Sequence, residues 1–97
     1  MIVSVAMLTV RQGHQAQVVD ILNDYVTKEK QVKGCVRAYY KRALNNDDTY
    51  LVYTEYDNLE HFQDSEKAEP AQEKDKNGNV EFALRPHLLK AFFGNFD

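Results

Sequence analysis

The chain has 97 residues, which is enough for one domain, and we expect that domain to span residues 1–97. With 43% hydrophobic and 28% charged residues, its composition is that of a soluble globular protein. The net charge of −3 disfavours a nucleic-acid partner, because phosphate binding requires a basic surface. No apolar run approaches the ~20 residues that span a bilayer, so no membrane partner is expected. Cys35 is the only cysteine, which excludes an intrachain disulfide or a cysteine zinc cage and favours the reducing cytoplasm.

Residues 2–10 are almost wholly apolar at both alternating sets of positions, a pattern typical of a strand buried on both faces. The segment has no basic region before it, so we interpret it as a strand and not as a signal peptide. Gly13 then breaks the pattern, and a helical period follows over residues 15–30. Apolar residues there recur on one side of a helix, at Val18, Val19, Leu22, Tyr25 and Val26.

Alternation returns over residues 35–44 and predicts a second strand, with Ala38, Tyr40 and Arg42 on one face and Cys35, Arg37 and Tyr39 on the other. The run Asn45–Asp48 consists of turn-forming residues, and residues 49–56 alternate again. Together they predict a hairpin. One face of its second strand carries Tyr50, Val52, Thr54 and Tyr56, and the other carries Leu51, Tyr53 and Glu55.

Asp57 or Asn58 is suited to cap a second helix, whose inner stripe would carry Leu59, Phe62 and either Ser65 or Glu66. Residues 67–79 are charged and poorly patterned. A short helix is expected over residues 80–85, before Pro86. Residues 90–96 predict a last strand, in which Gly94 would mark a bulge.

The resulting β-α-β-β-α-β order predicts a ferredoxin-like α+β fold, in which a four-stranded antiparallel sheet carries helices on one face. The other face would then be bare, although it presents Leu51, Tyr53 and the phenylalanines near the C-terminus. A bare apolar face of this size indicates an interface. We therefore expect a homodimer with two-fold symmetry, in which the two sheets face each other and form a shared barrel. The alternative is a monomer whose C-terminal tail partly hides this face.

The chain resembles the antibiotic biosynthesis monooxygenase family of dimeric α+β barrel proteins over most of residues 1–65. The matching segments are the end of the first strand, the start of the second, the hairpin turn and the junction between third strand and second helix: Arg11-Gln12-Gly13, Gly34-Cys35-Val36, Asn45–Asp48 and Thr54–Asn58 running on to Phe62. Most members carry a tryptophan where this chain has Tyr56, and many carry a histidine where it has Ser65.

The resemblance implies a pocket between the sheet and the helices. It also implies oxidation of a small aromatic or quinol-type compound, without a metal or other cofactor. Haem-degrading relatives need an asparagine on the first strand, a tryptophan at the junction and a histidine on the second helix. Here those positions hold Ala6 and Tyr56, and no histidine occurs between Phe62 and Pro86, which disfavours haem degradation.

Four residues are candidates for substrate binding: Tyr56, Phe62, Tyr40 and Arg42. The Tyr56 phenol could stack on an aromatic ring and bind it by a hydrogen bond. In the competing account, Tyr56 closes the edge of the core with its hydroxyl in water. In a pocket, Tyr56→Phe would leave stability nearly unchanged. Phe62 and Tyr40 would pack against the ring, and Arg42 would hold a phenolate, unless it only extends to solvent from a strand end.

No residue stands out as a catalytic base. His14, His61 and His87 fit no zinc spacing and are expected at the surface or at helix caps, where one of them could serve as a base. Cys35 is expected to be a small buried hydrophobe, since it has no evident base beside it. The leading hypothesis is a cofactor-independent monooxygenase. A non-catalytic ligand-binding dimer and an isomerase remain alternatives. An RNA-binding sheet is disfavoured, because the third strand lacks the basic-glycine-aromatic signature of such sheets.

Overall fold

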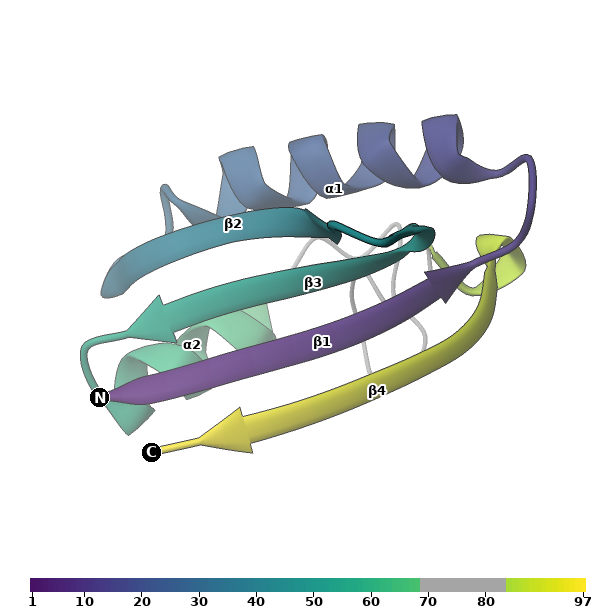
Figure 1. The fold of residues 1–97 in the computed structure, drawn as a ribbon. Coiled ribbons are helices and arrows are strands. Elements are labelled where there is room, and N and C mark those ends of the chain that lie inside the picture. The colour runs from purple at the N-terminus through teal and green to yellow at the C-terminus, as the bar shows by residue number, and fades with distance from the viewer. Residues whose placement is uncertain (69–83) are drawn as a thin grey trace.

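A computed structural model describes residues 1–68 and 84–97 and confirms the predicted element order. Four strands form one antiparallel sheet in the order β2-β3-β1-β4, and the helices α1 and α2 cover one of its faces (Figure 1). The elements are β1 (Ile2–Val10), α1 (Gln15–Glu29), β2 (Cys35–Ala43), β3 (Asn46–Tyr56), α2 (Leu59–Ala68), the 3-10 helix η2 (Arg85–His87) and β4 (Leu88–Phe96).

The hydrophobic core lies between α1 and the sheet, as the helical stripe predicts. Val18 and Leu22 of α1 are fully buried against β1 and β3. In the single chain β1 is buried on this side only, because Met7 on the other face is 42% exposed. The alternation of β3 is also confirmed: Tyr50, Val52, Thr54 and Tyr56 are all buried on the helix side.

The hairpin turn is shorter than predicted. It consists of Leu44 and Asn45 alone, because Asn46 already pairs with Ala43, so the prediction of a turn over Asn45–Asp48 was wrong. The ladder is irregular beside this turn, because Arg42 pairs with Tyr50 whereas Ala43 pairs with Asn46, so residues 47–49 have no partner in β2. Polar residues are tolerated at this end of β3 because they remain partly or fully exposed to water.

Besides the shift beside the hairpin turn, the sheet contains two bulges that change which face some residues occupy. Cys35 lies opposite Tyr56 and Arg37 lies opposite Glu55, so Val36 is an extra residue in β2. The prediction that Cys35 shares a face with Arg37 was therefore wrong, because Cys35 lies on the helix side with Tyr56. The second bulge is not at the predicted Gly94, which pairs regularly with Val5. It falls at Leu89, because Val10 pairs with Leu88 whereas Thr9 pairs with Lys90.

The start of α2 agrees with one of the two predicted caps. The backbone N–H of His61 donates to Oδ1 of Asn58 over 2.8 Å, so Asn58 is the N-cap. Leu59 is 53% exposed and does not join the inner stripe, which is carried by Phe62 and Ser65. The expectations for residues 67–79 and for a helix over residues 80–85 lie mostly outside the described residues.

A tight connection joins the loop after α1 to the junction between β3 and α2. The backbone N–H of Asp57 donates to the carbonyl of Gly34 over 2.9 Å. Gly34 has φ 86°, and a Cβ at this position would collide with the imidazole of His61. His61 also lies 2.5 Å from the Asp57 carboxylate, and this hydrogen bond holds the pKa of Asp57 below its usual value. The contact places the candidate site next to the end of α1.

Gly34→Ala is expected to destabilise the protein more than Gly13→Ala. Both glycines have φ 86°, so both substitutions carry the backbone cost of a left-handed alanine, roughly 1–2 kcal/mol. Only at Gly34 would the added methyl also collide with a side chain, since nothing lies within 4 Å of a Cβ at Gly13. Urea unfolding of the two variants would measure the difference. Equal losses would mean that His61 does not pack over Gly34.

Candidate functional site

Tyr56 ends β3 with its ring buried at 1% exposure. Phe62 packs edge-on against it, with the ring centroids 5.4 Å apart. This contact follows from local geometry. Tyr56 continues the helix-side alternation of β3, and Phe62 lies one turn into α2, where its side chain points back towards the sheet. The structure therefore brings these two candidate residues together.

The Tyr56 hydroxyl ends inside the protein on a carboxylate. It donates to Oε2 of Glu29 at the end of α1, and it lies 3.2 Å from Oγ of Ser65 in α2. Ser65 also donates to the same Glu29 oxygen over 3.0 Å. Glu29 is 4% exposed and Ser65 is 3% exposed. These three residues, here called the Glu29 cluster, join α1, β3 and α2 by side-chain hydrogen bonds, and the tyrosine hydroxyl does not reach bulk solvent.

Burying a carboxylate is costly unless hydrogen-bond donors surround it, and the two hydroxyls supply such donors. Glu29 was not identified from the sequence, because this residue stands between Lys28 and Lys30. Such a run of charged residues is typical of a solvated helix end. A signal was nevertheless present. Glu29 lies three residues after Val26 and seven after Leu22, which is the spacing of the buried stripe of α1. An acidic residue on such a stripe indicates a buried polar site.

Cys35 adjoins this cluster. It lies opposite Tyr56 in the β2–β3 ladder. Burial raises the pKa of its thiol above the usual value, and the charge of Glu29 raises it further. A raised pKa keeps the thiol protonated at neutral pH, and the thiolate is the nucleophilic form. Cys35 therefore behaves as a small, unreactive side chain.

The other two candidate residues are not brought to the Glu29 cluster. Tyr40 lies opposite Val52 and Arg42 lies opposite Tyr50, which are four and six residues from Tyr56 along β3. At strand spacing these offsets are about 13 and 20 Å. The Tyr40 hydroxyl donates to Oδ1 of Asn23 over 2.7 Å, and Arg42 is exposed.

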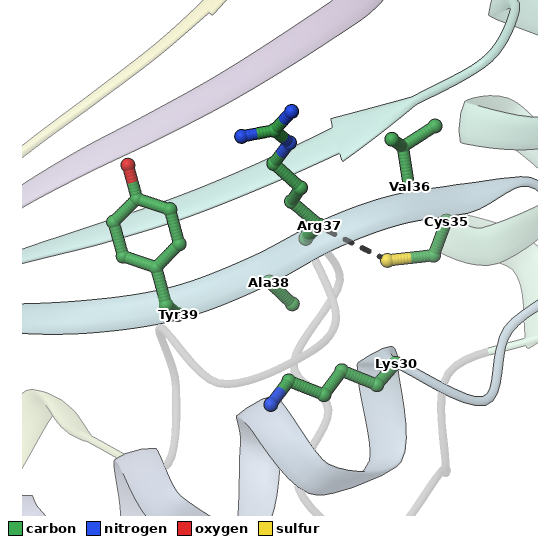
Figure 2. Close-up of a pocket in the computed structure, with 6 residues that line it drawn as sticks. All are labelled: Lys30, Cys35, Val36, Arg37, Ala38 and Tyr39. Carbon is green, nitrogen blue, oxygen red and sulfur yellow. Dashed lines mark hydrogen bonds between the residues drawn. The ribbon is translucent and has the colours of Figure 1, made fainter.

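A cavity of about 350 Å³ opens at the free edge of β2, between that strand and the end of α1. Its volume falls within the usual range of ligand pockets. In Figure 2, Lys30 and Ala38 lie on the helix side of β2, whereas Arg37 and Tyr39 lie on the other side. The cavity also touches Cys35, the strand partner of Tyr56, but neither Tyr56 nor Phe62 lines it, so the expectation that Tyr56 lines a pocket is not met by this cavity. Two cationic side chains, Lys30 and Arg37, flank this cavity.

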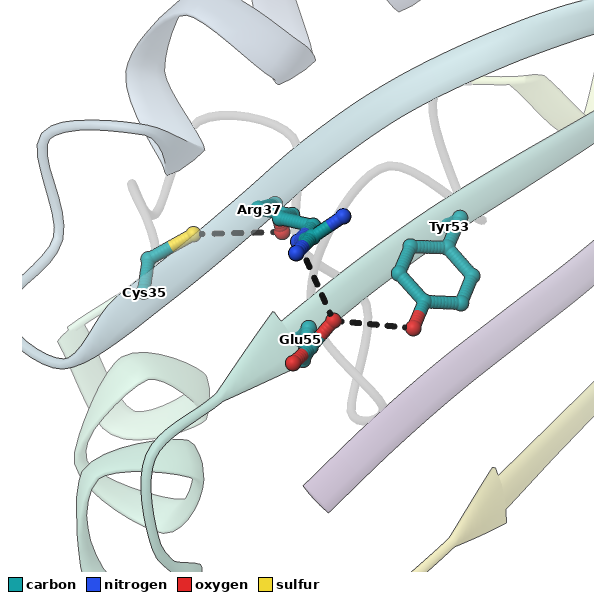
Figure 3. Close-up of polar contacts among 4 residues, drawn as sticks. All are labelled: Cys35, Arg37, Tyr53 and Glu55. Atoms are coloured by element: carbon teal, nitrogen blue, oxygen red, sulfur yellow. Dashed lines mark hydrogen bonds and ion pairs between the residues drawn. The ribbon is translucent and has the colours of Figure 1, made fainter. Parts of the chain in front are cut away.

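The helix-free face of the sheet carries a second polar group near the same edge (Figure 3). Glu55 is 7% exposed and accepts a hydrogen bond from the Tyr53 hydroxyl over 2.9 Å. Nε of Arg37 lies 3.6 Å from the same carboxylate oxygen. The hydrogen bond to Glu55 is the main reason that the pKa of Tyr53 is raised. The Tyr53 ring stacks on Tyr39 with centroids 4.9 Å apart.

Residues 1–68 and 84–97 form neither of two further classes of site. No three histidine, cysteine or acidic side chains among these residues are grouped so that they could hold a metal ion. No helix in this part of the chain combines the length and apolar character needed to span a bilayer.

The family described as "Antibiotic biosynthesis monooxygenase" has a model that matches residues 1–74. The chain belongs to this family. Solved structures have the same fold. A Deinococcus radiodurans protein ascribed to the family has a TM-score of 0.84 at 18% identity, with 100% of this chain and 91% of that chain covered. A mutant of SnoaB, a cofactor-independent oxygenase from Streptomyces nogalater, has a TM-score of 0.80 at 20% identity, covering 99% and 90%. A search of curated proteins gives no match.

Proposed function

We propose that the protein is a cofactor-independent monooxygenase that oxidises a small aromatic or quinol-type compound. The observation that carries this proposal is the buried carboxylate of Glu29, because such a reaction begins when a base removes a proton from the substrate. Membership of the monooxygenase family supports the reaction class. The likeness in fold to SnoaB, a cofactor-independent oxygenase, supports the absence of a cofactor.

In the proposed reaction the substrate enters from the β2 cavity and reaches Tyr56 and Phe62 once Cys35 moves aside, because neither of the two lines the cavity itself. Its hydroxyl gives a proton to the Tyr56 oxygen, and Tyr56 passes its own proton to Glu29, to which it is already hydrogen-bonded. Ser65 donates to the same carboxylate oxygen and helps to hold it in place. The substrate anion then reacts with dioxygen. Lys30 and Arg37 at the cavity favour an aromatic compound that carries negative charge.

Tyr56 and Phe62 remain the proposed substrate contacts because they adjoin the Glu29 carboxylate, although the cavity is not lined by either of them. Tyr40 and Arg42 would belong to the site only if the substrate is long enough to follow β2 towards the hairpin. A non-catalytic ligand-binding dimer and an isomerase are the competing functions. The first would bind aromatic compounds without consuming them, and the second would convert its substrate in the absence of oxygen.

Oxygen uptake with a panel of quinols and polyphenols tests the proposal. We expect uptake by the wild-type protein and a loss of roughly 10²–10⁴-fold in kcat for Tyr56→Phe, the contribution typical of a general acid–base group. Tyr40→Phe is the matched control, because its hydroxyl bonds Asn23 away from the cluster, and it should retain activity. Binding without uptake would favour a ligand-binding module, and anaerobic conversion an isomerase.

We also propose that two copies associate through the helix-free face of the sheet. Met7 and Phe92 are neighbours on this face and are 42% and 56% exposed. Leu51, which lies opposite Met7 on its other side, extends the apolar surface. Each subunit would then bind one small aromatic molecule. The proposed location is the reducing cytoplasm, which suits a chain whose cysteine, Cys35, is free.

A further inference from the structure

Two histidines that are far apart in the sequence meet at one corner of the fold. Nδ1 of His14 lies 2.9 Å from Nδ1 of His87, although 73 positions separate the residues. Their ring centroids are 5.2 Å apart, and the ring planes are inclined by 54°. Both side chains are half-buried, so the pair remains within reach of solvent. The proposed monooxygenase chemistry makes no use of this pair.

The backbone holds the two histidines in register. His14 is the N-cap residue of α1, and its side chain makes no capping hydrogen bond. Its N–H donates to the carbonyl of Arg11 over 2.9 Å. The N–H of Arg11 in turn donates to the carbonyl of His87 over 2.8 Å. Arg11 therefore links both histidines through main-chain bonds, which fixes their separation without using either imidazole.

We propose that His14 and His87 form a two-histidine site for a divalent transition-metal ion of the class that prefers imidazole, namely Zn²⁺, Ni²⁺ or Cu²⁺. Two nitrogens that each lie about 2.0–2.1 Å from one ion are about 2.9 Å apart at a right angle and about 3.3 Å apart at the tetrahedral angle. The two Nδ1 atoms are 2.9 Å apart as hydrogen-bond partners, so the backbone already brings them within the distance that a shared ion requires.

In the structure the two Nδ1 atoms share a hydrogen bond, so ligation requires the rings to turn until both lone pairs meet at one point. Both residues are only partly buried, so the rings are not enclosed by the core. Residues 1–68 and 84–97 supply no group of three ligating side chains. Water or an external ligand would fill the remaining coordination positions.

This site is separate from the Glu29 cluster. Ile2 at the start of β1 lies opposite Tyr56, whereas His14 follows the other end of the same strand. The eight residue steps of β1 amount to roughly 26 Å. A metal at the histidine pair would therefore not touch a substrate at Tyr56, and the two proposals can fail independently.

The test uses the untagged full chain and titrates Cu²⁺ and Zn²⁺ by calorimetry, with Mg²⁺ as a negative control. We expect Cu²⁺ and Zn²⁺ to bind at one site and Mg²⁺ not to bind. Either His14→Gln or His87→Gln should weaken binding by more than about tenfold, since even the loss of an outer-shell partner costs 10–100-fold. His61→Gln is the matched control, because this third histidine pairs with Asp57 elsewhere in the fold, and it should bind as the wild type does.

Electron paramagnetic resonance of the Cu²⁺ protein gives a second readout that does not depend on the measured affinity. The wild type and His61→Gln should show coupling to two imidazole nitrogens, and each single variant of the pair should show one. Absence of two-nitrogen coupling in the wild type would overturn the proposal. Equal affinity in all variants would do the same and would leave the pair as a hydrogen bond only.

Discussion

Replacing Tyr56 with alanine is expected to lower the free energy of unfolding by about 3–5 kcal/mol, the usual cost of removing a large buried aromatic side chain. The ring is 1% exposed and packs on Phe62, so its loss leaves a cavity at the junction of β3 and α2. The substitution also removes a hydrogen-bond donor from the Glu29 carboxylate. A domain of this size has only about 5–15 kcal/mol of total stability, so the variant should be close to unfolding at 37 °C.

Tyr56→Phe separates the two contributions, because it keeps the ring and removes only the hydroxyl. We expect a loss of about 1–3 kcal/mol, since a buried carboxylate then lacks one of its donors. If Tyr56 lined a pocket, as inferred from the sequence alone, this substitution would leave stability nearly unchanged. The matched control is Tyr40→Phe, whose hydroxyl bonds Asn23 at the surface and should cost less.

Urea denaturation of Tyr56→Phe, Ser65→Ala and the double variant would measure how the cluster is coupled. The two side chains share the same Glu29 oxygen, so their effects should not be additive. If Tyr56→Phe were as stable as the wild type, the tyrosine hydroxyl would not be bonded to Glu29, and the proton relay proposed above would lose its basis.

The regular part of the fold could be predicted from the sequence because burial imposes a period on it. The stripe of Val18 and Leu22 identified α1, and the alternation that ends at Tyr56 identified the buried face of β3. Local sequence signals also predicted features that depend on one specific hydrogen bond, such as the Asn58 cap of α2. Each of these features depends on residues that are close together in the chain.

What could not be predicted depends on how distant segments align. The bulge at Val36 moves Cys35 to the helix side, and it is defined only by the register against β3. The contact between His14 and His87 arises because β4 begins beside the end of β1. Glu29 was hidden for a different reason: its flanking lysines suggested a solvated helix end, whereas the long-range partners Tyr56 and Ser65 allow its burial.

Register also determines how the candidate site relates to the interface. The cavity at β2 is lined by residues from both faces of the sheet, since Ala38 points to the helices while Arg37 and Tyr39 lie on the helix-free face (Figure 2). Arg37 also meets the buried Glu55 carboxylate on that face (Figure 3). A second copy placed against the helix-free face would therefore approach the mouth of the cavity, so the proposed site and the proposed dimer should be coupled.

Met7→Lys is expected to convert the proposed dimer into a monomer. Met7 lies on β1, a central strand, between Leu51 of β3 and Phe92 of β4, and is 42% exposed in the single chain. Burying an unpaired ammonium costs roughly 3 kcal/mol or more. In a two-fold interface the substitution occurs twice, so the penalty is about 6 kcal/mol, or roughly 10⁴-fold in the dissociation constant.

Leu44→Lys is the matched control for this prediction, because Leu44 is 105% exposed in the hairpin turn, outside the strands that form this face. Sedimentation equilibrium at micromolar concentration should give a dimer for the wild type and for Leu44→Lys, and a folded monomer for Met7→Lys. A wild-type monomer, or a Met7→Lys variant that remains dimeric, would place the interface elsewhere or remove it. Because Arg37 and Tyr39 of the cavity lie on the same face, oxygen uptake should fall along with dimerisation in Met7→Lys and persist in Leu44→Lys.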